Sequence, residues 1–147
     1  MISLRPSSRA ELEIFDAMDS QAHARRYVIQ TGMATHRQNF DDPDIAYLSI
    51  ENGDGEFCGY FILVREADGR SIEFRRILVD HRKRGIGQAA IAAMERYCKA
   101  EIGVDRIWLD VFEDNEVGIH IYEKLGYVRF KEEPADGRML YFYEKTL

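Results

Sequence analysis

The sequence predicts a single α+β domain, residues 1–147, built around a mixed and mostly antiparallel sheet. Three strand-like segments follow one another with only short turns between them, which is typical of antiparallel pairing. A helical segment then separates the last of these strands from another buried strand, so that this one pair should run parallel. Two further strand-like segments flank a turn near the end of the chain and predict a closing hairpin. With 46% hydrophobic residues, the chain can bury one core.

The first half reads as a strand, two helices and a three-stranded meander. A short strand at 2–5 is ended by Pro6, and the two serines that follow can cap a helix beginning near Arg9. Weak periodicity over residues 21–40 predicts a second helix, where substrate contacts are expected. An acidic turn at 41–44 leads into the meander. Its strands are expected at 46–51, 56–64 and 71–79.

The second half begins with a helix over 85–102, in which Met94 and Cys98 belong to an apolar stripe facing the core. A buried strand at 106–112 follows it. Asn115 is a good N-cap for a short helix that runs to Leu125, and Gly126 suits the position that ends it. The closing hairpin is expected at 127–133 and 138–145.

Composition excludes several classes of protein. The formal net charge of -6 argues against nucleic-acid binding and is compatible with a cationic substrate. No run of eighteen apolar residues and no signal-peptide pattern occurs, so we expect a cytoplasmic protein without membrane contact. The two cysteines lie far apart and the four histidines lack metal-ligand spacing, so we expect neither a disulfide nor a metal site.

The segment from Arg76 to Gln88 is the first candidate site, because a strand runs into a basic, glycine-containing turn that opens a helix. A helix N-terminus with unpaired N–H groups attracts phosphate, and glycines let the ligand approach the backbone. A solvated basic turn would show the same pattern. The turn is not a Walker A loop, since Gln88 and Ala89 follow its second glycine, and Ala90 replaces the third glycine of a dinucleotide fingerprint.

A second motif lies about thirty residues beyond this turn. It consists of Asn115, Gly118, Tyr122, Gly126 and Tyr127. Taken singly, Asn115 can be read as a helix cap, Tyr122 as a core aromatic and Gly126 as a helix stop. Gly118 is less easily explained, because a glycine inside a helix costs about 1 kcal/mol relative to alanine and suggests that another group comes close to it. Taken together with the glycine turn, they resemble the GCN5-related N-acetyltransferase (GNAT) superfamily over residues 72–130.

The resemblance implies a GNAT-like acyl-CoA N-acyltransferase fold, with a splayed parallel strand pair and helices on both faces of the sheet. It implies acetyl-CoA as co-substrate, with pantetheine bound along the backbone of Ile77, Leu78 and Val79. Asn115, Gly118 and Tyr122 would border the thioester. The phosphates would be bound by Arg82, Lys83, Arg84, Gly85, Ile86, Gly87 and Gln88.

Acetyl transfer to an amine needs a neutral amine and a proton for the departing thiolate. Tyr122 is the candidate acid, because a phenol is protonated at neutral pH. Glu73 matches a position where one branch of the family carries a catalytic glutamate, although it could instead pair with Arg75 on the same strand. Asp110 and ordered water are the other candidate bases.

We therefore expect direct transfer in a ternary complex from acetyl-CoA to a primary amine, which could be a small-molecule amine, a polyamine or a peptide N-terminus. One alternative is a non-catalytic acyl-CoA-binding module, and another is a nucleotide-phosphate binder that uses the basic turn alone. The resemblance also allows a homodimer formed through the C-terminal strands.

Overall fold

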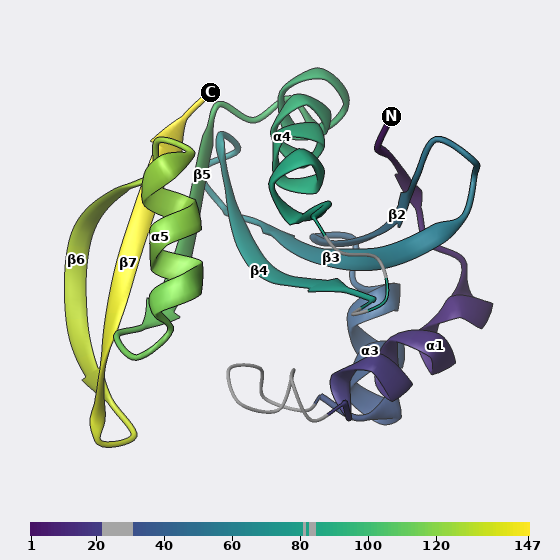
Figure 1. Ribbon diagram of the computed structural model, residues 1–147, viewed down its shortest axis with the longest axis horizontal. Helices are drawn as coiled ribbons and strands as arrows, with labels where there is room; N and C mark the ends of the chain where they lie inside the picture. Colours follow the sequence, from purple (N-terminus) through teal and green to yellow (C-terminus); the bar gives the residue numbers. More distant parts are fainter. Residues whose placement is uncertain (22–30, 81, 83–84) are drawn as a thin grey trace.

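The structure, a computed structural model, describes residues 1–21, 31–80, 82 and 85–147. Within these residues, one seven-stranded sheet has the order β1-β2-β3-β4-β5-β7-β6 (Figure 1). Only the β4–β5 pair is parallel, as the sequence predicts. The strands are β1 (Ser3–Pro6), β2 (Ile45–Glu51), β3 (Phe57–Arg65), β4 (Ser71–Val79), β5 (Arg106–Phe112), β6 (Val128–Ala135) and β7 (Arg138–Thr146).

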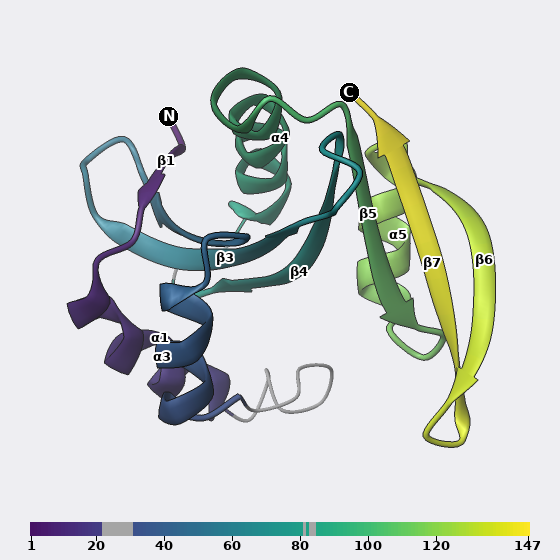
Figure 2. The same ribbon diagram turned by 180° about the vertical axis from the view of Figure 1, so that it is seen from behind.

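Helices cover both faces of the sheet, which confirms the expected architecture. In Figure 1, α4 and α5 lie on one face, and Figure 2, seen from behind, shows α1 and α3 on the other. The described helices are α1 (Leu12–Asp19), preceded by a 3₁₀ turn (Arg9–Glu11), α3 (Met33–Asp41), α4 (Gly87–Tyr97), extended by a π-helical turn (Cys98–Ile102), and α5 (Glu116–Lys124). None of the helices in the described ranges combines the length and hydropathy that a membrane crossing requires.

The prediction of one helix over 21–40 is wrong in part. Thr31 and Gly32 are not helical, and Gly32 has a φ of 85°, in the left-handed region that glycine tolerates best. Helix α3 begins only after it, at Met33, and ends at Asp41, one residue beyond the predicted end. The remainder of the predicted helix, residues 22–30, lies outside the described residues.

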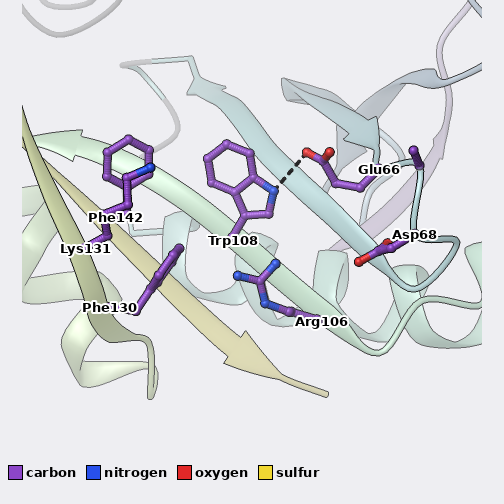
Figure 3. A pocket seen from close by; sticks show the side chains of 8 residues that line it. Glu66, Asp68, Arg106, Trp108, Phe130, Lys131 and Phe142 are labelled. Carbon is purple, nitrogen blue, oxygen red and sulfur yellow. Dashed lines mark hydrogen bonds between the residues drawn. The ribbon is translucent and has the colours of Figure 1, made fainter.

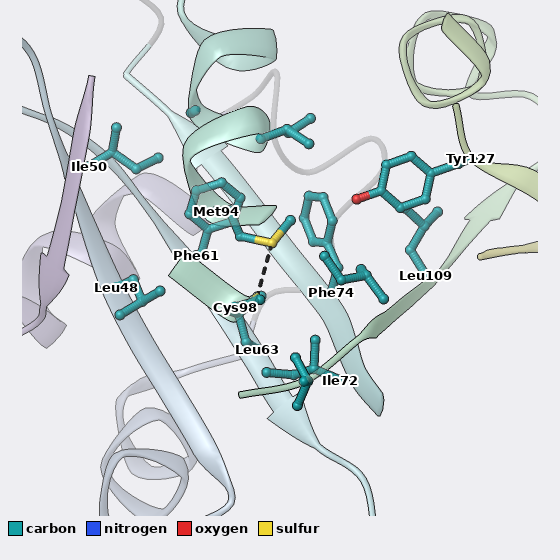
Figure 4. Packing of buried hydrophobic residues seen from close by; sticks show 14 of the residues in the cluster. Leu48, Ile50, Phe61, Leu63, Ile72, Phe74, Met94, Cys98, Leu109 and Tyr127 are labelled. Atoms are coloured by element: carbon teal, nitrogen blue, oxygen red, sulfur yellow. Dashed lines mark hydrogen bonds between the residues drawn. The ribbon is translucent and has the colours of Figure 1, made fainter. Parts of the chain in front are cut away.

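The larger hydrophobic core lies between the sheet and α4 (Figure 4). Phe61, Leu63 and Phe74 project from β3 and β4 against Met94, which is fully buried on α4. The stripe predicted on this helix is therefore core. A second cluster lies on the opposite face, where Phe15 of α1 stacks on Tyr60 of β3 with ring centroids 4.1 Å apart.

The parallel pair opens into a fork, which positions the candidate site. β4 and β5 pair at only three positions, the last of which joins Glu73 to Trp108. Each strand continues beyond this point with its other neighbour, β4 with β3 as far as Val79 and β5 with β7 as far as Phe112. The splayed parallel pair expected from the sequence is thus present, and its two inner edges are free of each other beyond Glu73 and Trp108.

Candidate active site

The inner edge of β4 supplies backbone groups that β5 does not pair. Ile77, Leu78 and Val79, the predicted pantetheine-binding residues, lie on this part of β4. Ile77 and Val79 pack against the core beneath α4, whereas Leu78 is buried in the opposite cluster beneath α1. An unpaired strand edge presents N–H and C=O groups that an extended ligand can bind as an added strand.

The turn before α4 has the form of an anion site. Gly85 has a φ of 80°, Ile86 is the N-cap residue and Gly87 is the first residue of the helix. A Cβ atom added at Gly85 or Gly87 would meet nothing within 4 Å, so the backbone can be approached closely. Gln88, in the first turn, is half-buried. The first N–H groups of a helix have no partners within it and attract an anion.

The basic side chains of this turn are only partly described. The guanidinium of Arg82 is 77% exposed and pairs with the Asp80 carboxylate at 2.8 Å. The Asp80 carboxylate, only 14% exposed, holds the guanidinium through two hydrogen bonds, and the exposed side of the cation remains accessible to a phosphate. The predicted phosphate ligands Lys83 and Arg84 lie outside the described residues.

Asn115 and Gly118 are linked directly at the start of α5. The Asn115 Oδ1 atom accepts a hydrogen bond from the Gly118 backbone N–H at 3.0 Å, which caps the helix. A Cβ atom at Gly118 would lie 2.8 Å from Asn115 Nδ2. The close neighbour of this glycine is therefore the capping side chain, and its contact with pantetheine stays a prediction.

Tyr122 lies on α5 at the fork between β4 and β5. Its half-buried ring makes an edge contact with Phe74 of β4 at 5.9 Å between centroids, and another with Tyr127 at 6.0 Å. Burial, followed by the negative charge of Asp110, raises the pKa of Tyr122 to about 12. The phenol is therefore a proton donor at neutral pH.

Two carboxylates stand beside the fork on the other face of the sheet. Glu73 accepts hydrogen bonds from Arg75, 2.9 Å from Nη2 and 3.2 Å from Nε, so the structure contains the pairing that the sequence left open. Burial and then the charge of Glu73 raise the pKa of Asp110, although Arg75 opposes the shift. No ion pair engages Asp110 within the described parts of the chain.

A buried polar network behind β4 escaped the sequence analysis. Asp19 of α1 is fully buried and accepts from Tyr60 at 2.5 Å and from Arg76 at 3.1 Å, while His36 Nε2 lies 2.7 Å from it. Asp16 lies close enough to complete a possible metal-ligand group with Asp19 and His36. Since the Asp19 carboxylate is already hydrogen-bonded, we interpret the network as structural support for β4. Its members are far apart in sequence, so no spacing reveals it.

An aromatic pocket of about 390 Å³ beside the fork was also missed (Figure 3). Trp108, which pairs in register with Glu73, lines this pocket, and its indole N–H donates to Glu66 at 3.0 Å. Phe130 and Phe142 come from the closing hairpin. The sequence signal, three aromatic residues on three strands, has meaning only when the strand order is known.

Comparison with known proteins gives consistent matches. Residues 11–127 match the family model described as the acetyltransferase (GNAT) family. An uncharacterized N-acetyltransferase, YdgE, of Bacillus subtilis (strain 168) is 25% identical over 144 residues, which cover 85% of this chain and 90% of the relative.

Solved structures agree on the fold. The spermidine N-acetyltransferase from Vibrio cholerae, in complex with CoA and spermine, matches with a TM-score of 0.83 and 17% identity, covering 99% of this chain and 95% of its own. A dodecameric structure of the same enzyme, in an intermediate state, matches with a TM-score of 0.77 and 18% identity, covering 99% of this chain and 93% of its own. At this level of identity, the similarity shows the fold alone.

Proposed function

Because the chain belongs to the acetyltransferase (GNAT) family and is an acetyl-CoA-dependent N-acetyltransferase, we propose that it transfers the acetyl group to a primary amine by direct attack in a ternary complex. One observation carries this proposal. A protonated phenol, Tyr122, and two carboxylates, Glu73 and Asp110, meet at the fork of the parallel strands from opposite faces of the sheet. A thioester held in the fork would have a proton donor on one side and a proton acceptor on the other.

We place acetyl-CoA on the α4 and α5 side of the fork. The free edge at Ile77–Val79 offers backbone groups to the pantetheine amides, and the N-terminal turn of α4 offers N–H groups to the pyrophosphate. Partly buried apolar side chains from both helices, among them Ile86 and Ile119, provide a nonpolar wall for the pantetheine chain. Asn115 and Gly118 lie at the start of α5, on the same side.

Asp110 is the better placed of the two carboxylates to act as the base. The Arg75 guanidinium occupies the Glu73 carboxylate, which leaves Glu73 less available to an incoming ammonium group. Asp110 has no such partner among the described residues, and its raised pKa makes it a stronger proton acceptor than an ordinary aspartate. Glu73 contributes the neighbouring negative charge that raises it.

The proton and electron movements then balance. Asp110 accepts a proton from the ammonium group of the acceptor, which frees the nitrogen lone pair. The new C–N bond forms as the C–S bond of the thioester breaks, and the Tyr122 hydroxyl gives its proton to the departing thiolate. The proton that the new amide nitrogen loses and the proton held by Asp110 both pass to solvent, and solvent reprotonates the phenolate of Tyr122.

The state of the cysteines supports direct transfer. Burial, followed by the charge of Glu95, raises the pKa of the Cys98 thiol to about 12, so this thiol is a poor nucleophile at neutral pH. Cys58 is also buried, and its thiol donates to the Glu56 carbonyl oxygen at 3.3 Å. Neither cysteine is therefore a good candidate for a covalent acetyl-enzyme intermediate.

The proposal is tested by release of free CoA from acetyl-CoA in the presence of single amines, one from each of three classes: a polyamine, an aminoglycoside and a peptide with a free N-terminus. We expect amine-dependent release, with the acetylated product confirmed by mass spectrometry. Binding of acetyl-CoA in calorimetry without acetylation of any amine would favour the alternative, a non-catalytic acyl-CoA-binding module. Thermal protection by ATP but not by CoA would favour a nucleotide-phosphate binder.

A further inference from the structure

The aromatic side chains that line the pocket beside the fork lie on the face of the sheet opposite α4 and α5. Its rings form a row across three neighbouring strands: Trp108 stacks beside Phe142, with centroids 6.1 Å apart and planes at 27°, and Phe130 meets Phe142 edge-on at 6.3 Å. In Figure 2, no described helix covers this face of β5, β7 and β6. The volume of about 390 Å³ lies in the range of small-molecule sites.

Phe130 reaches this row because of an irregularity in β6. The register between β6 and β7 shifts between Arg129 and Lys131, which leaves Phe130 without a paired partner. Such a bulge redirects the side chain of the extra residue. The Phe130 side chain stays 43% exposed, so a ligand can reach its ring from solvent.

The charges around the pocket are already engaged. Asp68 accepts from its own turn, at the backbone N–H groups of Arg70 and Ser71, and Glu66 holds the indole N–H of Trp108. Arg106 pairs with Glu144 at 2.8 Å. Lys131 pairs with Glu133 at 3.2 Å. The lining therefore carries two acidic and two basic side chains, each with a partner among the described residues, which favours a neutral ligand group over a charged one.

The half-buried ring of Trp108 is the one among the three aromatic rings of the pocket that no described cation covers. Arg106 lies over Phe130 at 5.4 Å, and Lys131 lies over Phe142 at 4.6 Å. Over the Trp108 ring, by contrast, no cation is found among the residues that the structure describes. Figure 3 shows the indole between the carboxylate of Glu66 on one side and the phenyl ring of Phe142 on the other. A flat and neutral group can stack there without displacing an ion pair.

The pocket is also close enough to Asp110, the proposed base, for one acceptor molecule to reach both. Asp110 lies two residues beyond Trp108 on the same face of β5, which corresponds to roughly 7 Å along a strand. We propose that the pocket binds the side group of the acceptor, and that the acceptors are arylalkylamines, in which a short aliphatic chain joins a neutral aromatic ring to the primary amine. This inference rests on the proposed function, because it takes Asp110 as the position of the reacting amine.

The pocket carries its own reporter, because Trp108 is the single tryptophan of the chain. We expect 2-phenylethylamine to change its fluorescence saturably, and n-butylamine to need about tenfold higher concentration for any effect. Phe130→Ala should weaken the 2-phenylethylamine response several-fold. Val128→Ala, an exposed position on the same strand that does not line the pocket, should leave the response unchanged. A response that fails to saturate, or that is the same with both ligands, overturns the inference whether or not any amine is acetylated.

Kinetics separate this inference from the proposed function. We expect kcat/KM for 2-phenylethylamine to exceed that for n-butylamine by about tenfold, and Phe130→Ala to remove most of this preference through KM. Glu66→Gln keeps an acceptor for the indole N–H and should change the preference less than twofold. A preference for 1,4-diaminobutane that Glu66→Gln abolishes would make the pocket a cation site and overturn the inference, while the proposed function stands. If no amine is acetylated, the proposed function fails, and the acceptor role of the pocket fails with it.

Discussion

Glu73 and Trp108 face each other at the last position where β4 and β5 pair, and both side chains lie on the sheet face opposite α4 and α5. Beyond this pair the strands separate, and Tyr122 approaches the opening from the other face through its contact with Phe74. The fork therefore divides the proposed site into a cofactor side and an acceptor side. Transfer of the acetyl group would take place in the plane of the sheet.

The assignment of Asp110 as the base predicts distinct pH profiles for the two carboxylate variants. The rate should fall as the pH drops through the raised pKa of Asp110, because the protonated acid cannot accept a proton. Asp110→Asn should remove this acidic limb and lower kcat/KM about 10²-fold or more. Glu73→Gln should keep the limb and move it to lower pH, since burial still raises the Asp110 pKa but the added effect of the Glu73 charge is gone. Stopped assays of CoA release across the pH range measure both.

The opposite pattern would identify Glu73 as the base. In that case Glu73→Gln would abolish the acidic limb and Asp110→Asn would only displace it. If both variants keep the wild-type limb and rate, ordered water is the proton acceptor.

Tyr122→Phe should lower kcat about 10²-fold and leave the KM for acetyl-CoA within about twofold, because only the proton donor is lost and the ring contact with Phe74 remains. Tyr127→Phe is the matched control. Among the described residues, no group meets the geometric criteria for a hydrogen bond to the buried Tyr127 hydroxyl, so its removal should leave kcat unchanged and change the free energy of unfolding by no more than about 1 kcal/mol. Wild-type kcat in Tyr122→Phe would exclude Tyr122 as the acid.

The Asn115 cap predicts a coupled effect on stability. Gly118→Ala places a methyl group 2.8 Å from Asn115 Nδ2 and should displace the capping side chain, costing about 1–2 kcal/mol in urea unfolding. Asn115→Ala should cost about 1 kcal/mol for the same reason. In the double variant the two costs should not add, because the cap is already lost and alanine then suits the helix better than glycine. Additive losses would show that Gly118 is required for another reason.

Glu11 should make the free energy of unfolding depend on pH in the acidic range. Hydrogen bonds from Arg5, against the opposing effect of burial, lower the pKa of Glu11 to about 2 from an ordinary value near 4.5. Because the folded-state pKa is depressed, this contribution is present above pH 4.5 and is lost as the pH falls towards 2. In urea unfolding at pH 7, the free energy of unfolding of Glu11→Gln should be ~1–3 kcal/mol lower than that of wild type. This difference should become smaller as the pH approaches 2. Glu13→Gln, at an exposed position on α1, is the control.

Much of the fold could be predicted because local signals agree with it. Asn115 caps α5 as predicted, and the helix predicted from residue 85 begins two residues later, at Gly87, since caps and glycines act over a few residues. The break at Gly32, which has a φ of 85°, was missed because a glycine within a weakly periodic segment does not by itself mark the end of a helix. The place of β7 between β5 and β6 is likewise a property of the whole sheet.

The candidate site was predictable where it consists of contiguous motifs, and not where it depends on pairs across strands. The glycine turn and Tyr122 could be named from spacing. The pairing of Glu73 with Arg75 was one of two alternatives, because neighbouring charges on a strand can meet each other or a ligand equally well. The juxtaposition of Trp108 with Glu66, 42 residues apart, required the register of the parallel pair.

The edge strand β6, at the opposite side of the sheet from β1, limits how copies of this chain can associate. Pro134 has no N–H to offer a neighbour, the bulge at Phe130 interrupts the ladder, and Arg129 and Glu132 add charge along the strand. A strand from a second molecule would find few consecutive hydrogen-bonding groups there. Growth of the sheet at this edge, a first step towards fibrils, is therefore disfavoured, and a homodimer that uses the C-terminal hairpin would have to meet through its flat surface.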